Sequence, residues 1–176
     1  MHDELTGLPN KRYFLQRLEM ALQQPSAGGG LAILFVDLNG FKAINDTHGH
    51  AMGDRYLKVI ADRLNHSMRA EDMVCRLGGD EFVCLVSGIV DRRRISRIAT
   101  KICAVIAAPA SIGTERMNTS ASIGIALSPA DGTTVETLIG HADSAMYRAK
   151  QCVTRYTFYR SDDKAVTGLS AVIRSV

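Results

Sequence analysis

The sequence predicts an α+β fold in which helices flank a central antiparallel sheet of about five strands. A compact apolar run at Leu31–Asp37 has the length of a buried strand. Two β-rich runs flank Gly78-Gly79, as in a β-hairpin. Apolar residues at helical spacing separate these segments, so the core elements follow the order β-α-β-β-α-β.

The first half of the chain predicts a helix, the apolar strand and a second helix. Asn10 is a capping residue before apolar residues that share one helical face, namely Phe14, Leu15, Leu18 and Leu22. A glycine-rich loop at 25–30 ends this helix. After the strand we expect a short helical piece at Phe41–Asn45 and a loop at Asp46–Gly53. The next helix then has its apolar residues at Leu57, Ile60, Ala61 and Leu64.

The second half predicts the hairpin, two more helices and two more strands. The hairpin strands are Met73–Leu77 and Phe82–Val86, and the apolar residues of the helix that follows are Ile95, Ile98, Ile102, Val105 and Ile106. Met117–Leu127 alternates as a strand, residues 133–136 have the form of a capping box for a fourth helix, and Arg155–Tyr159 is a last short strand. This order is the ferredoxin-like, split βαβ plan, with residues 1–160 as one domain and 161–176 as a C-terminal tail or linker.

Composition excludes several classes of protein. The 176 residues suffice for one domain with a sizeable core, and 46% hydrophobic with 22% charged residues excludes wholesale disorder. No apolar run approaches the ~20 residues of a membrane helix, and the polar start at 1–4 is not a signal peptide. A net charge of +3 is too small to indicate a nucleic-acid or membrane partner. We therefore expect a cytoplasmic domain without membrane contact, within a parent protein that other domains could anchor to a membrane.

The cysteines show no metal-binding or redox motif. They lie at positions 75, 84, 103 and 152 in apolar or helical surroundings and form no C-x-x-C pair. They are predicted to be reduced core residues. Cys75 and Cys84 would face each other in one alignment of the hairpin, but we do not expect a disulfide there.

Three acidic residues stand where strands are predicted to end. Asp37 closes the first strand, and Asp80 and Glu81 lie at the tip of the hairpin. Because the first strand and the hairpin are neighbours in this fold plan, we expect the three carboxylates to cluster. Like charges this close are costly unless a cation joins them, and Mg²⁺ suits one or two carboxylates together with substrate phosphates. Gly78 and Gly79, directly before the acids, would let a phosphate approach the backbone.

These acids and glycines, and the other polar residues that could form a site, also have purely structural interpretations. Carboxylates commonly end strands, and Gly-Gly is common in turns. Asn45 is suited to cap a turn, Asp54 to cap the second helix, and Lys150 to interact with a helix dipole. His48 and His50 have a spacing found in transition-metal sites, but no cysteine or third histidine lies near them in the sequence, so we favour loop packing for His48.

Several strings of the sequence together resemble the GGDEF-domain diguanylate cyclase family. Residues 76–82 read R-L-G-G-D-E-F, which is similar to the family signature, and residues 3–10 read D-E-L-T-G-L-P-N, which is similar to its opening motif. Residues 37–54 contain the D-L-N-G-F-K, N-D, G-H and G-D strings of its substrate loop, and residues 143–150 resemble its late helix. The strings follow the order and spacing of the family over residues 3–160, which makes chance a poor explanation.

The resemblance implies an adenylyl-cyclase-like fold, two GTP molecules as substrates, cyclic di-GMP as product, and Mg²⁺ or Mn²⁺ as the cofactor. It implies Asp37 and Asp80 as metal ligands, together with the Leu38 carbonyl. Glu81 would be a further acid near the metal. Asp80 is also expected to help deprotonate the attacking 3′-hydroxyl. The residues that the resemblance implies in catalysis are Asp80, Glu81 and Lys150.

The resemblance also implies how the nucleotide is held. Asn45 and Asp54 would hydrogen-bond guanine, with His50 in the same pocket wall, while Lys42 and Lys150 would face the phosphates. An amide and a carboxylate together match the guanine edge, whereas adenine would leave the carboxylate unpaired. The substrate-binding residues implied in this way are Lys42, Asn45, His50, Asp54, Gly78 and Gly79.

Two further strings concern regulation and rate. Residues 69–72 have the form R-x-x-D and the position of the family's inhibitory product site, so Arg69 and Asp72 are implied to bind cyclic di-GMP. Alternatively, they belong to a solvated charge cluster at a helix end. After Ala149-Lys150 the family continues with two residues and then Gly-Arg-Asn, whereas this chain reads Q-C-V-T-R-Y at 151–156. The arginine is displaced to Arg155, a departure that bears on the catalytic rate rather than on nucleotide binding.

We therefore predict a product-inhibited diguanylate cyclase in which two GTP-loaded protomers meet face to face. One alternative is a catalytically weak GGDEF domain that binds GTP or cyclic di-GMP and regulates a partner. A second alternative is an RNA-binding module, which can share the ferredoxin-like plan but needs stacking aromatics on its central strands. An aromatic content of 6% without tryptophan argues against this module, so we expect no nucleic-acid partner.

Overall fold

The computed structural model describes residues 1–23, 29–88, 91–152 and 154–163. Within these ranges, a five-stranded sheet with the strand order β2-β3-β1-β6-β7 forms the centre of the molecule. Its strands are β1 (Leu31–Asn39), β2 (Met73–Gly78), β3 (Glu81–Ser87), β6 (Ser120–Ser128) and β7 (Tyr156–Phe158). A two-stranded sheet contains β4 (Ala110–Ile112) and β5 (Glu115–Met117).

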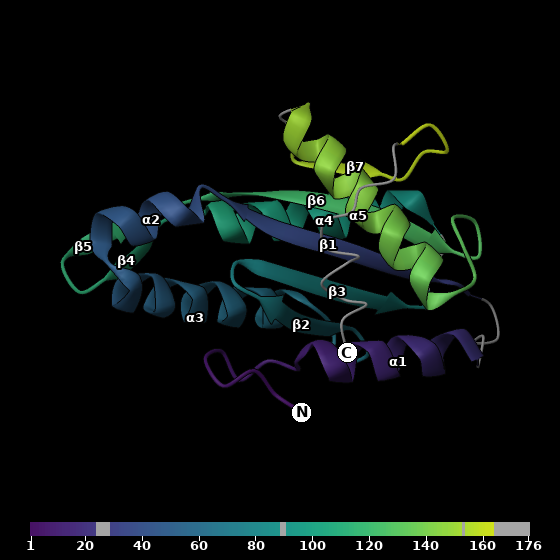
Figure 1. Ribbon diagram of the computed structural model, residues 1–176, viewed down its shortest axis with the longest axis horizontal. Helices are drawn as coiled ribbons and strands as arrows, with labels where there is room; N and C mark the ends of the chain where they lie inside the picture. The colour runs from purple at the N-terminus through teal and green to yellow at the C-terminus, as the bar shows by residue number, and fades with distance from the viewer. Residues whose placement is uncertain (24–28, 89–90, 153, 164–176) are drawn as a thin grey trace.

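Helices cover both faces of the central sheet (Figure 1). One face carries α1 (Lys11–Gln23) and α5 (Val135–Gln151), and the other carries α3 (His50–Ser67) and α4 (Arg92–Ala107). The short helix α2 (Phe41–His48) follows β1 directly and packs against α3 at one end of the molecule. The structure is therefore a three-layer arrangement with an apolar core on each side of the sheet.

The predicted α+β fold and its β-α-β-β-α-β order are confirmed. β1 pairs antiparallel with β3 and β6, and β2 pairs antiparallel with β3. The fifth strand differs from the antiparallel expectation, since β7 joins β6 in parallel. The reason is the connection: α5 crosses over between β6 and β7 and returns the chain to the same end of the sheet.

The alternation of side chains along β1 decides where its carboxylate lies. Residues 31, 33 and 35 pack into the core beneath α1 and α5, and residues 32, 34, 36 and 38 pack into the core beneath α3 and α4. Successive side chains of a strand point to opposite faces. Asp37 therefore continues the face that α5 covers.

Helix α5 approaches this face closely because β6 has a glycine at the contact. A Cβ atom at Gly124 would overlap the Ala142 carbonyl oxygen and the Met146 backbone nitrogen of α5. Without a side chain at this position, the helix backbone packs directly on the strand. The close packing brings the C-terminal turn of α5, with Lys150, over the end of β1.

The predicted loop at Asp46–Gly53 is wrong. α2 continues to His48 and α3 begins at His50, so Gly49 alone separates them. Gly49 has a φ of 83°, which lets the chain turn sharply between two helices. Asp54 consequently lies inside α3 and is not its N-cap.

Side chains cap two of the helices. Asn10 Oδ1 accepts a hydrogen bond of 3.1 Å from the Tyr13 backbone nitrogen, as the sequence predicts for the start of α1. At α5, Thr134 Oγ1 accepts from the Thr137 backbone nitrogen at 3.2 Å. The cap of α5 therefore lies one residue later than the predicted capping box at 133–136.

The cysteines are free, but only three of them are buried. Cys75 packs into the core beneath α1 and α5, whereas Cys84 packs into the core beneath α3 and α4. Since their side chains lie on opposite faces of the sheet, no disulfide forms across the hairpin. Cys103 is buried as predicted, and Cys152 at the end of α5 is exposed, contrary to the prediction of a core residue.

The C-terminal part of the described chain packs on α5. Asp163 forms an ion pair with Arg148 of α5. The predicted strand at Arg155–Tyr159 is β7. Residues 164–176 of the predicted tail, and most of the predicted loop at 25–30, lie outside the described residues. The division between domain and tail at residue 160 stays a prediction. In the parts of the chain that the structure describes, no helix combines the length and the apolar character needed to cross a membrane.

Candidate functional site

Three predicted acids meet at one corner of the sheet. Asp37 lies opposite Glu81 in the register of β1 and β3. The Leu38 backbone nitrogen donates a hydrogen bond of 3.3 Å to the Asp80 carbonyl oxygen. Because β3 begins directly after the hairpin turn, strand pairing alone brings Asp37 to the tip of the hairpin. The structure thus places these residues together, as we expected.

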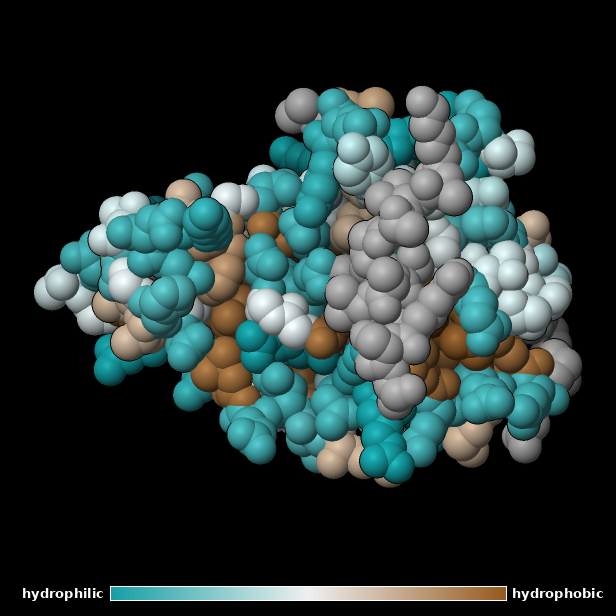
Figure 2. All heavy atoms as spheres, in the orientation of Figure 1, coloured by the Kyte–Doolittle hydropathy of each residue, from teal (hydrophilic) through white to brown (hydrophobic). Residues whose placement is uncertain are grey.

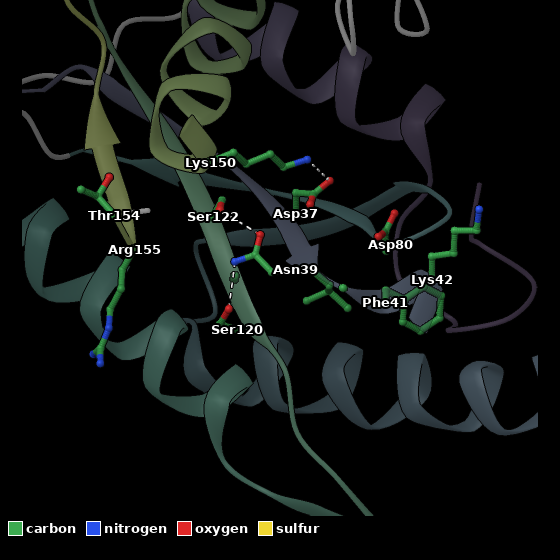
Figure 3. A pocket seen from close by; sticks show the side chains of 13 residues that line it. Asp37, Asn39, Phe41, Lys42, Asp80, Ser120, Ser122, Lys150, Thr154 and Arg155 are labelled. Atoms are coloured by element: carbon green, nitrogen blue, oxygen red, sulfur yellow. Dashed lines mark hydrogen bonds and ion pairs between the residues drawn. The ribbon is translucent and has the colours of Figure 1, made fainter. Parts of the chain in front are cut away.

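This corner is partly buried and carries an excess of negative charge. Asp37 is 7% exposed, and Lys150 Nζ lies 2.8 Å from its Oδ1 (Figure 3). Burial raises the pKa of Asp37, an effect that Lys150 opposes and Asp80 reinforces. Burial, together with the charges of Asp37 and Asp80, raises the pKa of Glu81 to about 7. Electrostatics of this kind favour a bound cation.

A cavity of about 590 Å³ opens beside the ion pair of Asp37 and Lys150. Its volume is typical of small-molecule sites. Five of the residues that line it were predicted as site residues, namely Asp37, Leu38, Lys42, Asp80 and Lys150. Figure 3 shows the side chains of Asp37 and Lys150 at the ends of β1 and α5, with Asp80 and Lys42 nearby.

The start of α2 borders the same cavity. Gly40 precedes the helix with a φ of 72°, and no side chain caps the first turn. Residues 39–42 line the cavity, so the uncapped end of the helix and the Lys42 side chain belong to one wall. Free backbone N–H groups at a helix start attract anions. This wall suits phosphate groups.

A polar network that the sequence analysis missed forms another part of the cavity. Asn39 Nδ2 donates to Ser120 Oγ at 2.9 Å, and Ser122 Oγ donates to Asn39 Oδ1 at 3.0 Å (Figure 3). Ser122 lies opposite Asp37 in the register of β1 and β6, and Ser120 lies opposite Asn39. The sequence signal that indicates this network is a pair of serines two residues apart, on the strand next to that of Asp37.

Arg76 holds the hairpin turn that carries Asp80. Its Nε and Nη2 donate to the Gly79 carbonyl oxygen at 3.0 and 2.8 Å, and its Nη1 donates to the two carboxylate oxygens of Asp3 at 2.9 and 3.0 Å. In the turn, a Cβ at Gly78 or Gly79 would meet nothing within 4 Å, so the space above these glycines is open. The opening motif of the chain therefore supports the turn from outside the cavity.

The residues predicted to bind guanine lie on α2 and α3, outside the cavity. Asn45 is half-buried on α2, and its side chain rests against Gly53 of α3. His50 and Asp54 are exposed on the first turns of α3. Helix α2 connects the two parts of the predicted site. Its first residue lines the cavity where the predicted phosphate-binding lysines lie, and Asn45 further along the helix is predicted to bind guanine.

The family profile described as "Diguanylate cyclase, GGDEF domain" matches residues 1–155. The chain belongs to the GGDEF domain family. It is 44% identical over 167 residues to the bifunctional diguanylate cyclase/cyclic di-GMP phosphodiesterase MucR of Pseudomonas aeruginosa, covering 94% of this chain and 24% of that protein. It is also 44% identical over 152 residues to the diguanylate cyclase TpbB of the same species, covering 85% of this chain and 35% of that protein. The chain thus spans about a quarter to a third of the length of these relatives, at 24% and 35%.

Solved structures show the same fold. The isolated GGDEF domain of TpbB from Pseudomonas aeruginosa superposes with a TM-score of 0.84 at 42% sequence identity, covering 90% of this chain and 93% of that chain. This similarity and the family match confirm the predicted family and fold.

The structure of this GGDEF domain also shows where the predicted inhibitory residues, Arg69 and Asp72, and the displaced arginine, Arg155, lie. Arg69 is exposed, with Nη1 3.8 Å from Glu71 Oε1. Asp72 Oδ2 accepts from the Arg69 backbone nitrogen at 3.4 Å, and within the described residues its buried Oδ1 makes no hydrogen bond. Arg155 lines the cavity, but its side chain extends away from Asp37 and Lys150 in Figure 3.

Asp3→Asn is expected to lower the free energy of unfolding at neutral pH by about 1–3 kcal/mol, because the half-buried Arg76 guanidinium loses its charged partner. Burial opposes ionisation of Asp3, but hydrogen bonds from Thr6 and Arg76 outweigh it and hold the pKa of Asp3 below its usual range. A lowered pKa stabilises the fold fully above the ordinary aspartate pKa of about 3.9. This contribution is lost as the pH falls through the lower pKa of the folded state.

Urea unfolding of the wild type and the Asp3→Asn variant at several pH values measures this effect. The difference between the two proteins should shrink in acid. Glu4→Gln, which changes an exposed neighbour, is the control. A difference of equal size at neutral and acidic pH would contradict the assignment.

Proposed function

We propose that this GGDEF domain condenses two GTP molecules into cyclic di-GMP with release of pyrophosphate. The observation that carries the proposal is the buried carboxylate of Asp37, which lies beside Asp80, Glu81 and Lys150 at the edge of a cavity. The relatives MucR and TpbB, which are named as diguanylate cyclases, support it.

The acidic corner fits Mg²⁺ or Mn²⁺. Burial and the neighbouring carboxylates raise the pKa of Glu81 to about 7, which is the mark of negative charges lacking a sufficient counter-ion. Asp37, Asp80 and the Leu38 carbonyl would hold the ion, with Glu81 beside them. Among the described residues, no cluster of three or more His, Cys, Asp or Glu side chains is positioned to bind a metal by itself. Mg²⁺ is commonly held by one or two carboxylates together with substrate phosphates. When bound, the ion supplies positive charge to the phosphates and the attacking oxygen.

The side chains around the cavity would bind and orient the triphosphate. Lys42 and the uncapped start of α2 neutralise phosphate oxygens, and Lys150 does the same from the opposite wall. Asp80 accepts the proton of the 3′-hydroxyl, and Glu81 adds to the negative field that holds the cation. Phosphoryl and nucleotidyl transfer depend mainly on such positioning and charge neutralisation.

The base would bind along α2 and α3. Asn45 supplies an amide and Asp54 a carboxylate, which together complement guanine and reject adenine. His50 lies in the same wall, one turn before Asp54 on α3. The open space above Gly78 and Gly79 leaves room for the nucleotide near the hairpin.

One protomer with one GTP cannot complete the reaction. The 3′-oxygen of one nucleotide attacks the α-phosphate of the other, pyrophosphate leaves, and the step occurs twice. Two protomers must therefore face each other with their nucleotides between them, so that homodimerisation is part of the mechanism.

Product formation from GTP and Mg²⁺ tests the proposal. Initial rates of cyclic di-GMP formation should rise more steeply than linearly with protein concentration. Strict proportionality at dilute enzyme would contradict the two-protomer mechanism. GTP or cyclic di-GMP binding without any product would instead favour a regulatory binding module, an alternative that the outward course of the Arg155 side chain supports.

Cyclic di-GMP is expected to inhibit the enzyme through Arg69 and Asp72. Arg69→Ala should relieve this inhibition by about tenfold in product concentration, because a charged hydrogen-bond donor to the ligand is lost. Inhibition curves of the wild type and the variant measure the effect, with Arg116→Ala, at an exposed arginine of β5, as the control. Identical curves for the wild type and Arg69→Ala would refute the site.

A further inference from the structure

A glycine lies at the contact between α2 and α3. Gly53 is buried inside α3, and a Cβ atom there would overlap Asn45 Oδ1 of α2. The same atom would lie 3.0 Å from Asn45 Cγ and 3.3 Å from Phe41 Cζ. The Asn45 amide therefore rests on the backbone of α3, in space that any other residue at position 53 would fill.

The backbone conformation does not account for this glycine. Gly53 lies within α3 and is not among the residues with positive φ, in contrast to Gly49 four residues earlier, which has a φ of 83°. Glycine is unfavourable inside helices because it loses more conformational entropy than other residues. The contact with Asn45 is the feature that requires it.

Asn45 is held from two directions. Its carbonyl oxygen accepts a hydrogen bond of 2.8 Å from the Gly49 backbone nitrogen, which fixes the backbone at the end of α2. Its amide is seated on Gly53, whose next neighbour in the chain is Asp54. The amide thus contacts the residue directly before Asp54 in α3, and Asp54 bears the second polar group proposed to bind guanine.

We infer that Gly53 is a positioning residue for base recognition. By lacking a Cβ atom, it seats the Asn45 amide next to Asp54, so that the two groups bind one guanine together. This role rests on the proposed function, and Gly53 itself acts only through Asn45. A side chain at position 53 overlaps the amide most closely and meets Phe41 at a longer distance. Gly53 and Asn45 do not line the cavity around Asp37 and Lys150, whereas Phe41 does.

Binding of α,β-methylene analogues of GTP and ATP, which cannot release pyrophosphate, tests the inference by calorimetry. The wild type should prefer the guanine analogue, and Gly53→Ala should lose about tenfold in affinity for it while its affinity for the adenine analogue stays the same. Gly140→Ala is the matched control, because Gly140 also lies within a helix and a Cβ there meets nothing within 4 Å. It should preserve both affinities.

The double variant Asn45→Ala/Gly53→Ala separates positioning from folding. Asn45→Ala removes the atoms that a Cβ at position 53 would overlap, so the double variant should fold even if Gly53→Ala alone does not. It should bind the guanine analogue as Asn45→Ala does, with no further loss.

Two results would overturn the role of Gly53: an unchanged guanine preference in Gly53→Ala, or an additional loss in the double variant. A wild-type protein without guanine preference would instead overturn the proposed function, and the inference with it.

Discussion

Asp37→Asn is expected to lower the rate of cyclic di-GMP formation by at least about a thousandfold, while the protein remains folded. Asp37 is the most enclosed acid of the proposed metal corner, at 7% exposure. Asparagine has nearly the same shape and still accepts a hydrogen bond from Lys150, so packing is retained. The variant loses the negative charge that would hold a cation between Asp80 and the phosphates.

Product formation at saturating GTP and Mg²⁺ measures the loss, and thermal unfolding monitors the fold. Asp46→Asn, which changes an exposed acid of α2, is the matched control and should leave the rate unchanged. Mn²⁺ binding without nucleotide should also weaken in Asp37→Asn. Activity within tenfold of the wild type would contradict the assignment of Asp37 to the metal.

Lys150→Met is expected to act in opposite directions on metal binding and on turnover. Lys150 Nζ lies 2.8 Å from Asp37 Oδ1, so a metal ion and the lysine compete for the same carboxylate. Removal of the lysine should tighten Mn²⁺ binding to the nucleotide-free protein severalfold. Turnover should nevertheless fall about a hundredfold, because a cation proposed to neutralise the triphosphate is lost.

Mn²⁺ titration followed by electron paramagnetic resonance, together with steady-state rates, measures the two effects. Lys42→Met is the charge-matched control, since Lys42 lines the same cavity and makes no ion pair with Asp37. It should weaken nucleotide binding without tightening Mn²⁺ binding. Weaker Mn²⁺ binding in Lys150→Met would refute the competition at Asp37.

Local patterns, placed in the predicted fold plan, were enough to predict that the three acids lie together. The apolar run before Asp37 and the β-rich runs around Gly78-Gly79 each specify a strand, and the hairpin must pair with a neighbouring strand. The fold plan makes the first strand and the hairpin neighbours, and strand register then brings Asp37, Asp80 and Glu81 together. The family strings added the expected roles of these residues.

Local patterns failed between Asp46 and Gly53. Polar residues and two glycines in this stretch are typical of a loop, yet α2 continues to His48 and α3 starts at His50. Packing between the helices, with Phe41 and Asn45 against Gly53, stabilises the helical conformation. Tertiary contacts of this kind override weak local preferences.

The sequence by itself determined the order of the elements, which strand residues share a face, and that acids stand at the strand ends. These features depend on neighbours within a few residues. Only the tertiary structure decided that Lys150 contacts Asp37, that Asn39 joins Ser120 and Ser122, and that Asn45 rests on Gly53. The contacts of Lys150 and Asn45 depend on how closely a helix packs against its neighbour, and the space left by a missing side chain at Gly124 and at Gly53 sets that distance. The contacts of Asn39 depend on the register between β1 and β6.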